Sequence, residues 1–315
     1  MISEDIVTID TNFVRPCLGA SHLIIENGHA AFVDAGTNHS VPYLLKSLKQ
    51  NNLDVADVSY LFITHVHLDH AGGAGKLMQY LPNAKLVIHP RGARHLQEPS
   101  RLVESAIGVY GKQVFTNLYG DIIPVPLNKM IIIEDQQILK MQGRAFACFY
   151  TEGHARHHYC IFDKASKSVF AGDSFGVSYR ELDTSCGEFI FPTTSPTQFD
   201  PIEAHKAIDQ IVSYRPNVVY LTHYSRVDAI ERLANDLHSS IDMFVKIAME
   251  HKNSKHRTTA IRSAMAEYLV EALFSHKCNF TKHEINEILA VDIKVNTMGL
   301  ECWLDQSNCS QQRIK

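Results

Sequence analysis

The sequence predicts a layered α/β protein that ends in a group of helices. Short apolar runs rich in β-branched and aromatic residues alternate with segments of helical periodicity over residues 1–226. Beyond this point the apolar residues recur every three or four positions, as in amphipathic helices. With 315 residues, 45% of them hydrophobic, the chain can bury a full core. We therefore expect a main domain over residues 1–226, a helical appendage over 227–306 and a frayed polar tail over 307–315.

The main domain shows strand and helix patterns in alternation. Asn27-Gly28 separates two apolar runs and favours a hairpin turn with positive φ. Asp200-Pro201 predicts a helix that begins at Pro201, with Asp200 as its N-cap. The patterns predict strands over residues 23–25, 31–33, 60–63, 84–89, 130–135, 145–150, 168–171 and 218–221, and helices within 41–52 and 91–120.

Three helices are predicted in the appendage. The first carries one apolar stripe, formed by Ile230, Leu233, Leu237, Ile241, Phe244 and Ala248. A polar break over residues 251–257 separates it from a second helix over 261–272, and a shorter third helix covers 285–289. Such regular stripes must be buried. They can pack against the main domain as a cover or as a lid over a site in it, against each other, or against a second subunit in a homodimer.

A cluster of histidines and a carboxylate follows the predicted strand 60–63. The sequence there is His65-Val66-His67-Leu68-Asp69-His70, followed directly by Ala71-Gly72-Gly73. Residues at such a turn fan out instead of alternating between the two faces of a sheet. Neutral imidazole nitrogens and carboxylate oxygens are the ligands that Zn²⁺, Fe²⁺ and Mn²⁺ accept. A turn that merely happens to be histidine-rich is the alternative, but the density of ligands favours a metal site.

Ligand chemistry also follows three later strands. His154 comes soon after the strand 145–150, Asp173 after 168–171, and His223 after 218–221. Taken singly, each would be an ordinary polar strand terminus. Together with the first cluster, four strand ends with ligand chemistry predict one edge of a sheet that binds metal.

The order of these motifs resembles that of the metallo-β-lactamase-fold hydrolases, over residues from about 20 to 225. The resemblance implies an αββα sandwich with two metals at one edge of the sheets. It assigns His65, His67 and His154 to the first metal, Asp69, His70 and His223 to the second, and Asp173 to a bridging position. It also implies that Asp34 supports the ligands through hydrogen bonds. His158 matches a position where the family often repeats a histidine, which would lie behind the ligands or near the substrate, and a structural hydrogen-bonding role is favoured for it. After His223 the chain departs from the family pattern with Tyr224-Ser225, which leaves the ligand itself intact.

The resemblance implies two divalent metal ions, with zinc as the first choice and iron or manganese as the alternatives. Two such ions generate a bridging hydroxide near neutral pH, which would attack the carbonyl of an ester, thioester or lactone. Asp69 and Asp173 are the candidate catalytic residues that shuttle its proton. A mononuclear iron enzyme of the sulfur dioxygenase type remains an alternative. So does a non-enzymatic, metal-containing regulator whose appendage contacts a partner.

Composition restricts the partners. A formal net charge of −4 gives no reason to expect nucleic acid or an anionic membrane surface. No long apolar span and no signal-like N-terminus is recognisable, and the seven cysteines are scattered, which favours a reduced, cytoplasmic protein. We expect a small-molecule substrate, and a homodimer if the appendage is not a lid. Phe175, Tyr179, Phe189 and Phe191 follow Asp173 and would either bind an apolar acyl group or pack in the core.

Overall fold

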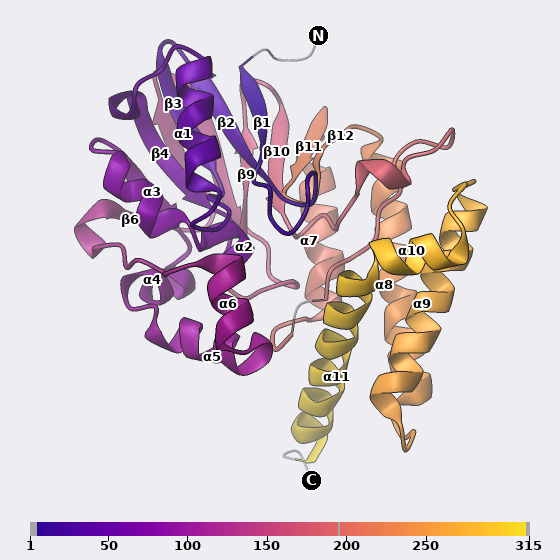
Figure 1. The fold of residues 1–315 in the computed structure, drawn as a ribbon. Helices are drawn as coiled ribbons and strands as arrows, with labels where there is room; N and C mark the ends of the chain where they lie inside the picture. Colours follow the sequence, from indigo (N-terminus) through magenta and orange to yellow (C-terminus); the bar gives the residue numbers. More distant parts are fainter. Residues whose placement is uncertain (1–4, 195, 313–315) are drawn as a thin grey trace. The chain divides into compact units, whose positions relative to one another are not determined.

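A computed structural model describes residues 5–194 and 196–312, and it divides into two compact units (Figure 1). The first unit contains the described residues up to Tyr150, together with His157–Gly172 and Tyr214–Asp228. The second contains Thr151–Arg156, Asp173–Ser213 and the chain from Ala229 onward. The last crossing between the units thus follows Asp228, and the earlier crossings add two internal segments to the second unit.

The first unit contains two six-stranded sheets. Sheet A has the order β1 (Ile6–Asp10), β2 (Ala20–Glu26), β3 (His29–Val33), β4 (Val58–Ile63), β5 (Lys85–Ile88) and β6 (Met130–Ile132). Sheet B has the order β12 (Ser225–Val227), β11 (Val218–Leu221), β10 (Ser168–Gly172), β9 (Tyr159–Asp163), β8 (Arg144–Tyr150) and β7 (Ile138–Met141). Strands β1 to β3 pair antiparallel, and the β2–β3 turn is the predicted hairpin, with φ of 48° at Asn27 and 77° at Gly28. Strands β3 to β6 pair in parallel, as do β10 and β11.

Helices form the crossovers between the parallel strands of sheet A, because parallel neighbours cannot be joined by a tight turn. These elements are α1 (Val41–Gln50), η1 (Val55–Asp57), α2 (Leu68–Ala71), α3 (Ala74–Tyr80), α4 (Pro90–Gln97), α5 (Ser100–Tyr110), α6 (Lys112–Tyr119) and η2 (Leu127–Lys129). Leu44 and Leu48 of α1 and Leu77 of α3 are buried in one core cluster with Phe32 and Leu61 of the sheet. The helices therefore cover one face of sheet A.

The other face of sheet A packs against sheet B. Along β3 and β4, Ala31, Val33 and Phe62 alternate with residues of the helix-covered face and share a core cluster with Phe146 and Phe170 of sheet B. This alternation follows from the two-residue period of a strand. The result is the predicted α/β sandwich with two sheets at its centre.

Several polar links cross between the sheets, and two of them involve buried side chains that ionise. The buried Arg144 of β8 donates to both carboxylate oxygens of Asp163, through Nη2 at 2.6 Å and Nε at 3.1 Å, and through Nη1 to the carbonyl of Ile25 in sheet A. His22 of β2 lies 3.2 Å through Nε2 from the carbonyl of Leu221 in sheet B. Burial lowers the pKa of His22 to about 4, so the imidazole is neutral and donates Nε2–H.

The second unit is mostly helical. It contains η3 (Arg180–Leu182), α7 (Pro201–Ser213), α8 (Ile230–His251), α9 (Arg257–Ser275), α10 (Lys282–Ile288) and α11 (Ala290–Gln312). The expected N-cap of α7 is present, since Asp200 Oδ1 accepts from the backbone N–H groups of Ile202 and Glu203. Helix α8 packs against α7, α9 and α11, and Leu237, Phe244 and Met265 are fully buried. The predicted apolar stripes are therefore buried within this unit.

The C-terminal end differs from the expectation. Residues 307–312, predicted to be a frayed tail, form the end of α11, and residues 313–315 lie outside the described part of the chain. The apolar pattern of this helix is interrupted by Asn296 and Thr297, which are nevertheless buried. Asn296 Oδ1 accepts from the backbone N–H of Thr194, so a polar residue occupies a core position through its hydrogen bonds. Helical periodicity alone therefore did not predict α11, which follows the third predicted helix.

Among the described residues, no helix is both long enough and apolar enough for a bilayer crossing.

Candidate metal centre

The predicted ligands all follow the ends of strands, as the sequence indicated. His65 comes two residues after β4, and His67 is the N-cap of the short helix α2, which carries Asp69 and His70. His223 comes two residues after β11, and Asp173 directly after β10. His154 follows β8. Five of the seven ligands belong to the first unit, and His154 and Asp173 belong to the second.

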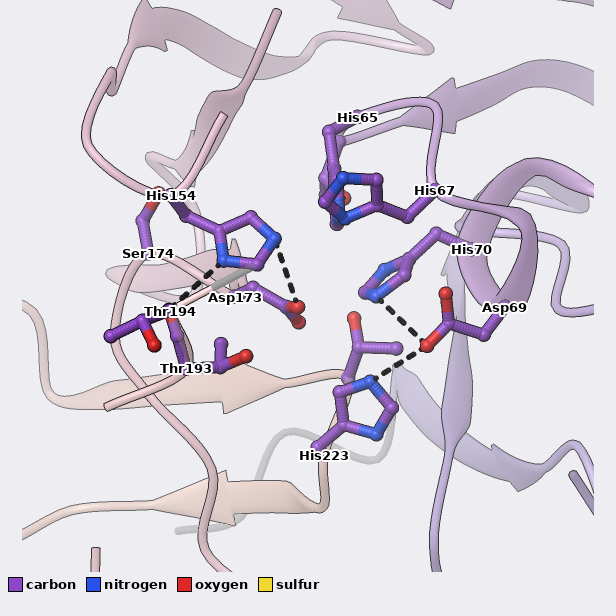
Figure 2. Close-up of polar contacts among 12 residues, drawn as sticks. His65, His67, Asp69, His70, His154, Asp173, Ser174, Thr193, Thr194 and His223 are labelled. Carbon is purple, nitrogen blue, oxygen red and sulfur yellow. Dashed lines mark hydrogen bonds and ion pairs between the residues drawn. The ribbon is translucent and has the colours of Figure 1, made fainter. Parts of the chain in front are cut away.

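Asp69, His70 and His223 form one cluster in the first unit (Figure 2). Their potential ligand atoms all lie within 4.8 Å of one another. Asp69 Oδ2 is 3.2 Å from His223 Nε2 and 3.8 Å from His70 Nε2. His70 is fully buried and His223 almost so. One carboxylate oxygen is thus approached by two imidazole nitrogens at a protected position.

Asp34 orients His70 within this cluster. Its Oδ2 is 2.7 Å from His70 Nδ1 and accepts from the hydroxyl of Thr222 at 2.9 Å. Its Oδ1 accepts from the backbone N–H of Thr64 at 2.9 Å, and the hydroxyl of Thr64 lies 3.0 Å from both oxygens. Four donors surround this buried carboxylate, and His70 donates to it as the Nδ1–H tautomer. The lone pair of His70 is then on Nε2, the nitrogen that faces Asp69.

His65 and His67 face each other, with 2.7 Å between His65 Nε2 and His67 Nδ1. The hydroxyl of Thr64 donates to Asp34, so it accepts from His65 Nδ1 at 3.1 Å. This leaves the lone pair of His65 on Nε2, directed toward His67. The ring of the buried His158 stacks on that of His65, with 4.8 Å between their centroids. Gly172 makes room for His158, because a Cβ at residue 172 would lie 2.6 Å from His158 Nε2.

The second unit holds its two ligands in contact with each other (Figure 2). His154 Nε2 lies 3.3 Å from Asp173 Oδ2, and both side chains are almost fully buried. His154 Nδ1 lies 3.2 Å from the carbonyl of Thr193, to which it donates as the Nδ1–H tautomer. The adjacent Ser174 donates to the hydroxyl of Thr151 at 3.1 Å. As for His70 in the first unit, an oxygen atom accepts a hydrogen bond from Nδ1–H, and Nε2 is directed at a carboxylate.

A small cavity opens beside His154 and Asp173, and every residue that lines it belongs to the second unit. Its volume of about 20 Å³ has room for one or two water molecules. Its lining is mostly apolar, and α7 and α8 contribute five of the lining residues. The lining residues are Glu152, His154, Asp173, Ser174, Gly176, Pro192, Thr193, Phe199, Ala204, Ala207, Ile208, Leu237 and Ile241.

The donor set fits divalent metal ions. His70, His154 and His223 each direct Nδ1 at an oxygen, which for His223 is the carbonyl of Leu18 at 2.7 Å. In each case Nε2 carries a lone pair that points at a carboxylate oxygen of Asp69 or Asp173. A cation between two electron-rich atoms that face each other would stabilise both, and the oxygen behind each imidazole orients its Nε2 toward that position.

The sequence reasoning missed the threonines that position this network. Thr64 and Thr222 each directly precede a ligand histidine, and both reach Asp34. The repeated Thr-His at two strand ends was the available signal. The aromatic residues expected near the mouth mostly pack in the core, because Phe175 and Phe191 are fully buried and do not line the cavity. Phe199 is the aromatic side chain that does line it.

Comparisons with known proteins identify the family and the fold. A model of the metallo-beta-lactamase superfamily matches residues 14–223. The metallo-beta-lactamase fold-containing protein ST1585 of Sulfurisphaera tokodaii is 27% identical over 61% of this chain and 67% of its own length. Its crystal structure aligns over 94% of this chain and 97% of that chain, with a TM-score of 0.64 and 22% identity.

Two further proteins are similar over different extents. The crystal structure of the metallo-beta-lactamase family protein TTHA1429 of Thermus thermophilus covers 98% of this chain and 95% of that one, with a TM-score of 0.68 and 15% identity. A probable hydroxyacylglutathione hydrolase of Schizosaccharomyces pombe is 24% identical over 63% of this chain, which spans 60% of that relative. The structural likeness includes the C-terminal helices and shows a shared fold.

Proposed function

The chain belongs to the metallo-beta-lactamase superfamily, and from that premise we propose that it is a binuclear metal-dependent hydrolase of esters, thioesters or lactones. The observation that carries the proposal is the approach of His70 Nε2 and His223 Nε2 to one carboxylate oxygen of Asp69. The tautomers set by Asp34 and by the Leu18 carbonyl leave a lone pair on both nitrogens, which supports a role for them as metal ligands.

The seven ligands would hold two metals. Asp69, His70 and His223 would bind one, while His65, His67 and His154 would bind the other and Asp173 would bridge them. Zinc suits this set of nitrogen and oxygen ligands, and iron or manganese are the alternatives. When bound, such a pair supplies a water-derived nucleophile at neutral pH and a Lewis acid for the carbonyl oxygen.

The protein groups would then move the proton and exclude bulk water. Asp69, whose carboxylate is about one-quarter exposed, is the ligand able to exchange a proton with solvent. Asp173 is almost buried and lies on the cavity, where it can accept a proton from the nucleophile and pass it to the leaving group. The buried Asp34 holds the imidazole of His70 in place and does not reach the reacting atoms.

The cavity supports a substrate with an uncharged acyl group. Ile208, Leu237 and Ile241 provide apolar walls beside Asp173. The cavity, with room for one or two water molecules, can take only the end of an acyl chain, and each methylene group buried there contributes about 0.8 kcal/mol. The Schizosaccharomyces relative is named for hydrolysis of hydroxyacylglutathione, in which an acyl group is joined to glutathione. We therefore place acyl-thioesters first among the candidate substrates.

The test is a hydrolysis screen with metal-analysed protein. It should contain acyl-glutathione thioesters, acyl esters, lactones and a phosphodiester, and it should be repeated with His223→Ala. We expect turnover of acyl substrates by the wild type and a loss of at least 100-fold in the variant, because a metal ligand is removed. His29→Ala is the matched control. His29 is the first residue of β3 and is not one of the predicted ligands, so this variant should keep full activity.

Other outcomes would replace the proposal. Oxygen consumption with a persulfide, without hydrolysis, would identify a dioxygenase. Preferred turnover of the phosphodiester would contradict the acyl assignment. Metal-loaded protein that turns over none of these substrates, but binds a partner stably, would favour a regulator.

A further inference from the structure

Helices α7 and α8 carry the same short motif, a histidine followed four residues later by an aspartate. The motif is His205 and Asp209 in α7, and His238 and Asp242 in α8. Four residues correspond to about one helical turn, so each pair projects from one face of its helix. All four residues belong to the second unit and lie apart from the predicted ligands described above.

The two motifs contact each other reciprocally. His205 Nε2 lies 3.2 Å from Asp242 Oδ1, and His238 Nε2 lies 3.2 Å from Asp209 Oδ1. The other two ring nitrogens, His205 Nδ1 and His238 Nδ1, are 2.6 Å apart. The imidazoles are about one-quarter exposed, while the carboxylates are largely exposed. Each helix thus supplies the carboxylate that holds the other helix's histidine.

The rings lie edge to edge, in nearly one plane. Their planes differ by 12° and their centroids are 4.9 Å apart. Ring bonds of about 1.33 Å place each ring atom about 1.1 Å from the centre of a five-membered ring. The centroid separation therefore equals the Nδ1–Nδ1 distance plus two ring radii, which puts both nitrogens on the line between the centroids. The in-plane lone pair of each Nδ1 points at the other ring.

The carboxylates decide the protonation of this pair. Each Nε2 faces an aspartate, and an ionised carboxylate only accepts hydrogen bonds, so both Nε2 atoms carry hydrogen. A neutral imidazole has one N–H, which leaves both Nδ1 atoms as acceptors. Two lone pairs directed at each other across 2.6 Å require a positive charge between them. That charge is either a shared proton or a metal cation.

We propose that His205 and His238 bind a divalent transition-metal cation of the zinc, nickel or copper class through their Nδ1 atoms. An imidazole that ligates a metal with one nitrogen and donates the other to a carboxylate is a common arrangement at metal sites, and both histidines show it. A divalent cation neutralises the two aspartates, whereas a shared proton leaves the group with one negative charge.

The geometry needs little change to hold the ion. Bonds of about 2.0–2.1 Å at a tetrahedral angle require about 3.3 Å between the two nitrogens, which is less than 1 Å beyond their present separation. Solvent can supply the remaining ligands, because the imidazoles are partly exposed. Residues next to each histidine, Ala204 and Leu237, line the cavity. The ion would therefore tie together the two helices that form the cavity walls.

The test counts zinc ions in the full-length protein by equilibrium dialysis over a range of free Zn²⁺ concentrations. We expect the wild type to bind one more Zn²⁺ than either His205→Gln or His238→Gln. His283→Gln is the matched control, because His283 forms a similar contact with Glu287, at 3.5 Å and four residues apart, without a second histidine; it should keep the wild-type count. Asp209→Asn should raise the Kd of the extra ion about 10- to 100-fold.

An NMR measurement on the wild type alone does not depend on whether the variants fold. Added Zn²⁺ should shift the ¹⁵N resonances of both Nδ1 atoms while both Nε2 atoms stay protonated. The proposal is overturned if the wild type and the histidine variants bind equal numbers of zinc ions. It is also overturned if the Nδ1 resonances do not shift when zinc is added, and the pair is then assigned to a shared proton. The inference does not rest on the proposed hydrolase activity, and either can fail without the other.

Discussion

Leu237→Ala tests whether the appendage sets substrate size. Leu237 of α8 is fully buried and lines the cavity beside His154 and Asp173. It also packs closely over the loop after Asp173, because a Cβ on Gly176 would lie 2.6 Å from Leu237 Cδ2. The substitution removes three carbon atoms from the cavity wall and leaves the predicted ligands unchanged.

The size of the effect follows from the buried carbons. The enlarged cavity should accept an acyl chain longer by two methylene groups, each of which contributes about 0.8 kcal/mol when buried. The kcat/KM ratio of the longer to the shorter acyl-thioester should therefore rise by about 1.6 kcal/mol, or roughly 14-fold. The same change should cost about 3–5 kcal/mol of unfolding free energy, as expected for a buried leucine.

The assay compares kcat/KM for an acyl-thioester series in the wild type, Leu237→Ala and Leu233→Ala. Leu233 is equally buried one turn earlier on α8 and does not line the cavity. The control variant should lose similar stability in urea unfolding and keep the wild-type preference. A Leu237→Ala protein that is destabilised but shows an unchanged chain-length preference would refute the role of α8 in substrate selection.

Three other predictions address the support of the site and of the sandwich. Asp34→Ala should weaken zinc binding about 10- to 100-fold in dialysis, because His70 loses the acceptor that orients it; unchanged affinity would show that Asp34 is dispensable. The pKa of His22, lowered by burial to about 4, means that the unfolded chain takes up a proton more readily than the folded one. The unfolding free energy should therefore fall by about 2–3 kcal/mol as the pH drops from 7 to 4.5, and His22→Gln, measured by urea unfolding at both pH values, should lack this part of the fall. Arg144→Met should cost about 3–5 kcal/mol in the same assay by leaving the buried Asp163 carboxylate unpaired; a loss below 1 kcal/mol would contradict that account.

The positions of the ligands were predictable because they depend on local pattern. A buried strand followed by histidine or aspartate, as at His65 and Asp173, places the side chain at a sheet edge wherever the strand packs. The supporting atoms were not predictable in this way. Carbonyls such as those of Leu18 and Thr193 have no signature in the side-chain sequence, although they set the tautomers of His223 and His154.

Two features of the appendage depend on contacts between distant segments and were not predicted from its sequence. Helix α11 buries Asn296, a polar residue whose hydrogen bonds to Thr194 replace the missing apolar pattern. The motif of His205 is visible in the sequence, but its partner His238 is identified only by how α7 packs against α8. Sequence patterns therefore do not predict contacts between segments that are distant in the sequence.

The most direct test of the central claim compares the wild type with His70→Ala in one experiment, with zinc content and acyl-thioester hydrolysis measured on the same samples. His70 is fully buried and forms one cluster of three predicted ligands with Asp69 and His223. We predict that His70→Ala loses one zinc relative to the wild type and at least 100-fold in kcat/KM, with its fold retained by circular dichroism. Undiminished hydrolysis by a variant that has lost this zinc would contradict the binuclear mechanism.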